Sequence, residues 1–188
     1  IASKGSVEGE KMSKSLGNVV DPIELEKKYS ADVVRYFLLR EVPFGEDGVF
    51  DEQKLIERNN FELANELGNL LNRVLTLIEK NCDSKIPDAK TDQELSKKLN
   101  LGAIESNMEK YQMHFAISEI MAFVKECNRF TNEKEPWKTS GAAQKKVLFS
   151  LADSLRVTAI LLSPFLPSTS EKILDSLGVK KFSFADVK

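Results

Sequence analysis

The sequence is poor in the residues that build disulfide frameworks and metal centres, with two cysteines and one histidine among 188 residues. Cys82 and Cys127 are far apart and lack the spacing of metal ligands, so we expect reduced thiols, as in a cytoplasmic protein. His114 has no cysteine or histidine close to it in sequence, which favours a packing or surface role on a helix. The composition therefore argues against a disulfide-stapled scaffold and predicts no metal site in this chain.

Long hydrophobic runs and a strong charge bias are also absent. No apolar stretch approaches the roughly 20 residues that span a bilayer, and no signal-peptide pattern is visible at the start, so we expect no membrane partner. The formal net charge is −2, whereas a protein that binds nucleic acid without selectivity is usually basic. A site that reads a few unpaired bases by stacking and edge hydrogen bonds remains compatible with this balance.

Strand-type alternation does not persist anywhere, whereas apolar residues recur at spacings of three and four. This periodicity predicts an all-α fold. We expect a small helical segment over residues 1–50 and an antiparallel bundle of about five helices over residues 51–188. Neither an internal repeat nor a low-complexity tract interrupts the chain.

Capping residues and breakers set the expected helix limits. Asp21 followed by Pro22 predicts a helix start, with an end near Lys28. Ser30 is expected to cap a second helix, which ends at the proline and glycines of residues 42–48. The further helices are expected from Asp51 to about Lys80 with a break at Asn59–Asn60, from Asp92 to Tyr111, up to about Thr131, from Ala142 to Leu162, and from Ser168 to Leu177.

A short run near the start carries phosphate-binding chemistry: Lys11, Met12, Ser13, Lys14 and Ser15. Two ammonium groups and two hydroxyls are donors that stabilise charge spread over a polyphosphate. Helix periodicity does not cover residues 1–20, so the run is expected in a loop. A bare pair of lysines is usually an ordinary basic loop, but the whole string over residues 9–18 is far more specific.

A second candidate site combines Asn69 and Arg73 with the only tryptophan, Trp137. Residues four apart share a helix face, and an amide beside a guanidinium offers donors and an acceptor suited to a base edge. Trp137 follows Pro136 in a charged connector, where a rigid aromatic ring suits base stacking, worth about 1–3 kcal/mol per base. Periodicity alone leaves a plainer interpretation open, namely a solvated helix face and a core tryptophan.

Four stretches of this chain, residues 9–18, 42–48, 60–73 and 132–137, resemble methionyl-tRNA synthetases, which are class I aminoacyl-tRNA synthetases, and the likeness extends over about residues 9–178. Residues 11–15 match the KMSKS signature of that class. The resemblance implies that Lys14 binds the phosphates of ATP, used with Mg²⁺, during methionine activation. It also implies that the residues matching the family's anticodon readers recognise the CAU anticodon of tRNA(Met): Asn69, Arg73, Pro136 and Trp137.

Several parts of such an enzyme are missing from the sequence. No His-Ile-Gly-His type signature precedes the loop, and the cysteine-rich zinc knuckle and the methionine pocket belong upstream. The chain is therefore expected to be the C-terminal part of a methionine–tRNA ligase, inactive without the catalytic domain. Residues 21–50 would link the loop to the bundle, which is a hypothesis from their place in sequence.

Three alternatives stay open at this point. The leucyl, isoleucyl, valyl or cysteinyl enzymes share the loop but read other anticodons, and Asn69, Arg73 and Pro136–Trp137 argue against them. A stand-alone tRNA-binding module would have no use for a triphosphate loop. A helical interaction protein with accidental motifs would have to match residues 9–18 and 60–73 together by chance.

Overall fold

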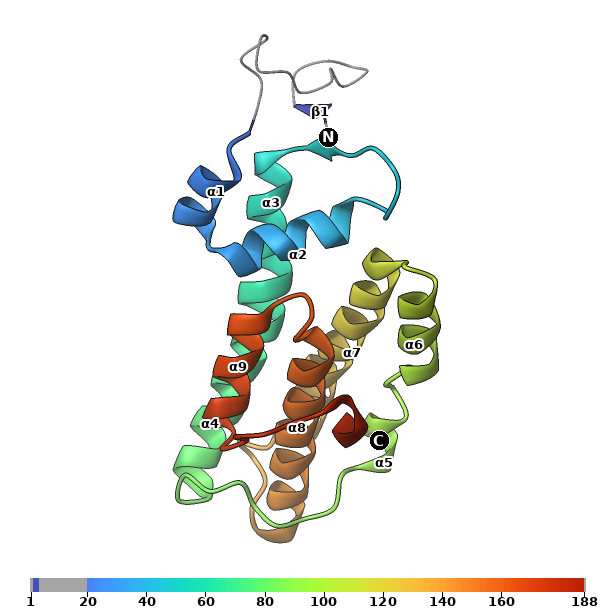
Figure 1. Cartoon of the computed structure of the whole chain (residues 1–188). Helices are drawn as coiled ribbons and strands as arrows, with labels where there is room; N and C mark the ends of the chain where they lie inside the picture. Colours follow the sequence, from blue (N-terminus) through green and yellow to red (C-terminus); the bar gives the residue numbers. More distant parts are fainter. Residues whose placement is uncertain (1, 4–19, 188) are drawn as a thin grey trace.

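The computed structural model describes residues 2–3 and 20–187 and places a small helical segment at one end of a helical bundle (Figure 1). Helix α1 (Pro22–Tyr29) begins where predicted, because the Asp21 carboxylate accepts the Ile23 N–H at 2.8 Å. Helix α2 (Ala31–Glu41) follows Ser30 as predicted. The Ser30 side chain makes no capping hydrogen bond, so its expected capping role is wrong.

The described strands are two residues long. Strand β1 (Ala2–Ser3) pairs in parallel with β2 (Val49–Phe50), with Ala2 opposite Val49 and Ser3 opposite Phe50. Two residue pairs form a bridge rather than a sheet layer. The all-α prediction is confirmed, since helices make up every other regular element of the described chain.

One long helical segment joins the small segment to the bundle. Helix α3 (Glu52–Arg58) passes directly into a π-helical stretch, η2 (Asn59–Gly68), and then into α4 (Asn69–Asn81). The predicted break at Asn59–Asn60 is wrong. Asn59 keeps helical dihedral angles, with φ −58° and ψ −47°. The wider turns of the π-helical stretch are seen at its end, where the Asn69 N–H donates to the Ala64 carbonyl five residues back.

The rest of the bundle consists of α5 (Gln93–Ser96), α6 (Leu101–Glu109), α7 (Met113–Lys134), α8 (Gly141–Leu162), α9 (Pro167–Ser176) and the 3₁₀ turn η3 (Phe184–Val187). Consecutive helices from α6 to α9 run antiparallel (Figure 1). The α8 and α9 predictions are confirmed to within a residue at each end. The single helix expected over residues 92–111 is wrong, because residues 97–100 separate two helices and Asn100 caps the second through the Ala103 N–H.

Two groups of buried side chains hold these elements together. The larger lies inside the bundle and includes Leu70, Val74 and Ile120. The smaller joins α2, β2 and α3, where Phe37 meets Phe50 edge-to-face with ring centroids 5.6 Å apart. The long helix therefore contributes to both groups, and the domain boundary at residue 50 stays a prediction.

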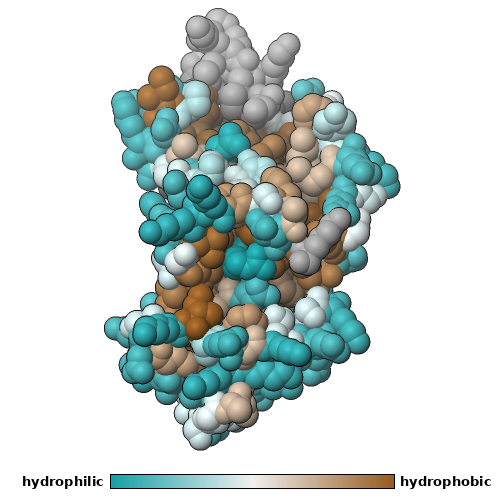
Figure 2. All heavy atoms as spheres, turned by 60° about the horizontal axis from the view of Figure 1, so that its bottom comes forward, coloured by the Kyte–Doolittle hydropathy of each residue, from teal (hydrophilic) through white to brown (hydrophobic). Residues whose placement is uncertain are grey.

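The outer surface is mixed in character. On the face drawn in Figure 2, hydrophilic side chains surround smaller hydrophobic areas. Among the residues that the structure describes, no helix has the length and apolar character needed to cross a membrane.

Candidate functional site

The structure brings together three of the residues singled out in the sequence. Asn69 and Arg73 lie in the first turns of α4, and Trp137 lies in the connector between α7 and α8. The Arg73 Cζ atom lies 5.4 Å from the centroid of the Trp137 ring. Trp137 is 46% exposed, so it is a surface ring and the core interpretation is wrong.

A residue that the sequence analysis did not single out holds Arg73 in this position. Asn132, near the end of α7, accepts a hydrogen bond from Arg73 Nη2 to its Oδ1 at 2.9 Å. The guanidinium is therefore fixed by an amide on one side and an aromatic ring on the other. Such a group keeps further N–H donors in a defined plane, which suits recognition of a base edge.

The connector that carries Trp137 is itself fixed. Helix α7 is followed by Glu135, whose left-handed backbone (φ 43°) turns the chain. Pro136 is buried, and its carbonyl accepts a hydrogen bond from the Nε2 of the buried Gln144 at 2.8 Å. The Lys138 N–H bonds the Glu135 carbonyl at 2.7 Å. The buried Pro136 thus anchors the turn, while the ring of the neighbouring Trp137 stays at the surface.

Between η2–α4 and α7 runs a groove of about 580 Å³, which we call the amide groove. Its lining is dominated by asparagines, namely Asn65, Asn69, Asn72, Asn128 and Asn132. Each amide offers both donors and an acceptor, the mixture that base edges require. Four of these asparagines were not singled out from the sequence, although their spacings, four and three on η2–α4 and four on α7, were visible there.

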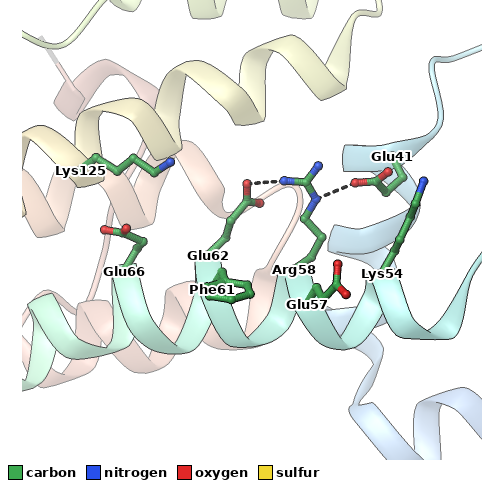
Figure 3. Close-up of a pocket in the computed structure, with 8 residues that line it drawn as sticks. All are labelled: Glu41, Lys54, Glu57, Arg58, Phe61, Glu62, Glu66 and Lys125. Carbon is green, nitrogen blue, oxygen red and sulfur yellow. Dashed lines mark hydrogen bonds and ion pairs between the residues drawn. The ribbon is translucent and has the colours of Figure 1, made fainter.

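A second groove of about 520 Å³, the charged groove, adjoins the first and shares Glu66 and Lys125 with it. Figure 3 shows its side chains projecting from the long helix, α2 and α7. Arg58 donates to Glu41 Oε1 at 2.6 Å and to Glu62 Oε1 at 2.8 Å.

Glu62 is buried at the centre of a polar contact between α2 and the long helix. Tyr36 donates its hydroxyl to Glu62 Oε2 at 2.5 Å, and Arg40 Nη2 lies 3.3 Å from Oε1. Burial alone would raise the pKa of Glu62, but the Tyr36 hydroxyl and the two guanidinium groups outweigh it and lower that pKa. Burial, together with the Glu62 charge, raises the pKa of Tyr36 far above its usual value.

Further contacts dock α2 on the bundle. The Asp32 carboxylate accepts the backbone N–H groups of Ser168 (3.4 Å) and Thr169 (2.6 Å) in the first turn of α9. Arg35 Nη2 donates to the Pro164 carbonyl at 2.8 Å. The Asp32 bonds use the unpaired N–H groups at a helix start, which favour a negative charge.

The predicted loop residues Lys11, Met12, Ser13, Lys14 and Ser15 lie outside the described residues. Cys82 and Cys127 are free thiols, and burial raises the pKa of Cys127 to about 12. In the described ranges, His, Cys, Asp and Glu side chains form no group of three or more that could hold a metal ion.

Comparison with known proteins assigns both halves of the chain. Residues 92–186 match the anticodon-binding domain of tRNA ligase, and residues 4–75 match tRNA synthetases class I (M). The helices from α5 onward therefore match an anticodon-binding domain of tRNA ligases, and the part of the chain up to residue 75 matches class I aminoacyl-tRNA synthetases.

Individual relatives narrow the class. The chain is 46% identical to a methionine–tRNA ligase of Caldanaerobacter subterraneus over 92% of its own length, and 44% identical to that of Brucella suis over 95%. It superposes with a TM-score of 0.85, at 37% identity over 96% of its length, on Mycobacterium tuberculosis methionyl-tRNA synthetase in complex with methionyl-adenylate. The chain belongs to the methionyl-tRNA synthetase family. It spans 29% and 37% of the two ligases and 38% of the solved chain.

Proposed function

We propose that the amide groove and Trp137 recognise the CAU anticodon of tRNA(Met) on behalf of a methionine–tRNA ligase. The observation that supports this most directly is the convergence of Asn69, Arg73 and Trp137, which come from two separate parts of the chain. A ring presented at the surface beside a fixed guanidinium forms a stacking platform. The adjoining amides supply hydrogen bonds that distinguish one base edge from another.

The energetic roles of these side chains differ. Stacking on Trp137 is worth about 1–3 kcal/mol and tolerates any base, because every base has a π-face. Selectivity has to come from edge contacts with Asn69 and Arg73, each worth about 1–3 kcal/mol against a wrong base. The groove thus combines one unselective anchor with several selective contacts, and Pro136 supports the anchor.

For the full-length enzyme, we propose that the loop of residues 11–15 contributes to ATP-dependent methionine activation. Lys14 would bind the ATP phosphates, and Lys11 would add positive charge where negative charge grows in the transition state. ATP with Mg²⁺ is then the cosubstrate, and the catalytic domain is the partner of this region. Residues 21–50, docked on the bundle through Asp32 and Arg35, would link the loop to the anticodon site.

The anticodon proposal is tested by titrating the chain with a CAU anticodon stem-loop and following Trp137 fluorescence. We expect quenching by CAU and a weaker response to a loop with an altered anticodon. Asn69→Ala and Arg73→Ala should each weaken CAU binding about 10- to 100-fold, as expected for the loss of one good edge contact.

Two matched variants sharpen this test. Arg73→Lys keeps the charge but loses the planar donor group, so binding should fall nearly as far as in Arg73→Ala. Lys172→Ala removes a positive charge from an exposed position on α9 and should leave binding unchanged. An equal response of the wild-type chain to both stem-loops would refute the proposed specificity.

A further inference from the structure

The amide groove ends at a pair of side chains that leaves two acceptors available. The Asn128 Nδ2 group donates to the Glu66 backbone carbonyl at 3.1 Å and to Glu66 Oε2 at 3.1 Å. Both hydrogens of this amide are therefore used. Within residues 20–187, neither Glu66 Oε1 nor Asn128 Oδ1 has a hydrogen-bond donor, so the pair presents only acceptors to the groove.

The charges on either side indicate what kind of donor belongs there. The charged groove carries four carboxylates, Glu66 among them, and three cations, one of which, Arg58, is already paired with Glu41 and Glu62. Such a lining has no excess of positive charge to hold a phosphate, whereas the two available acceptors suit a neutral N–H donor. Lys125 faces Glu66 from α7 without an ion pair between them (Figure 3), so the Glu66 carboxylate is not neutralised from that side.

The position of the pair along the helix separates it from Trp137. Glu66 precedes Arg73 by seven residues, which is roughly 10 Å at about 1.5 Å per residue. That separation exceeds the about 3.4 Å between stacked neighbouring bases. If one base of an RNA strand stacks on Trp137 beside Arg73, the base that contacts Glu66 is therefore a different one, splayed away from the first.

We propose that Glu66 and Asn128 form an acceptor pair that reads the exocyclic amino group of cytosine or adenine in the bound anticodon strand. The inference rests on the proposed function and names a further specificity-determining site for it. Cytosine N4 and adenine N6 are the donors on the pairing edges of these bases, while uracil presents a carbonyl oxygen at the same place. Two acceptors facing that oxygen would reject uracil without any steric clash.

The test compares the CAU stem-loop with two loops that each lack one amino group: uracil in place of the cytosine, and purine in place of the adenine. The wild-type chain should bind CAU about tenfold more tightly than one of these loops. In Glu66→Gln the side chain keeps its shape and one acceptor for Asn128 but gains an N–H donor. The affinity ratio for that same loop should then fall below about threefold.

Glu57→Gln is the matched control. Glu57 lies on the same long helical segment, and its substitution removes the same charge from the charged groove. It should shift the affinities of all three loops together and leave both ratios unchanged, and thermal melts would confirm that each variant is folded. Unchanged ratios in Glu66→Gln overturn the inference while leaving the proposed function in place. Equal binding of all three loops by the wild-type chain overturns both.

Discussion

Glu62 is the residue on which most of the polar contact between α2 and the long helix depends. Its side chain is 9% exposed and accepts from Tyr36, Arg40 and Arg58. Replacing one partner of a buried charge network leaves the others uncompensated. We therefore expect Glu62→Gln to lower the free energy of unfolding at pH 7 by about 3 kcal/mol, measured by urea denaturation.

The same residue gives an acid dependence with a definite sign. The folded-state pKa of Glu62 lies below its usual 4.5, so the unfolded chain binds more protons in that range. Its contribution is complete above about pH 4.5 and is lost as the pH falls through the folded-state pKa. The slope of stability between pH 3 and 5 should thus be smaller in Glu62→Gln.

Between elements, Asp32 connects α2 to the start of α9. Leu166 precedes α9 and offers no side-chain cap, so a carboxylate from another helix takes over that role. Loss of a capping side chain costs about 1 kcal/mol, and more where it is buried. We expect Asp32→Ala to lower the melting temperature by several degrees and Asp32→Asn, which retains an acceptor, to lower it less. Equal melting temperatures for all three proteins would contradict a capping role.

Helices with a regular apolar stripe could be predicted from sequence, and α8 and α9 are examples. The errors fall where the role of a polar residue in a helix was predicted wrongly. Asn59 and Asn60 predicted a break, but the Asn59 amide donates to the neighbouring Asn60 side chain at 3.3 Å and leaves the helical backbone bonds in place. Residues 97–100 carry no proline or glycine, so the interruption before α6 was marked in the sequence only by Asn100, a residue type that commonly caps a helix.

The candidate site was predictable only in part for a related reason. Asn69 and Arg73 share a helix face by spacing, but the Arg73–Asn132 bond joins residues 59 positions apart. Packing of α4 against α7 decides that contact, and no local pattern encodes it. The amide groove is therefore a product of tertiary structure, while its individual asparagines are ordinary polar positions in sequence.

At the scale of the whole molecule, the chain spans about a third of the length of its relatives. The loop of residues 11–15 supplies only part of the chemistry proposed for methionine activation. We predict that the purified 188-residue chain gives no methionine-dependent exchange of pyrophosphate into ATP above a blank. A full-length methionine–tRNA ligase is the positive control, and exchange by the isolated chain would contradict the prediction.

The continuous path from α3 through η2 to α4 carries a consequence for how this region can vary in length. One residue inserted between Glu62 and Asn69 would turn α4 relative to α3, and Arg73 would then no longer point toward Asn132 and Trp137. The number of residues between Glu62 and Asn69 therefore fixes how the face that meets α2 is oriented relative to the face that we assign to RNA. We expect length variation to be confined to connectors such as residues 82–92, whose length does not set the relative orientation of these two faces.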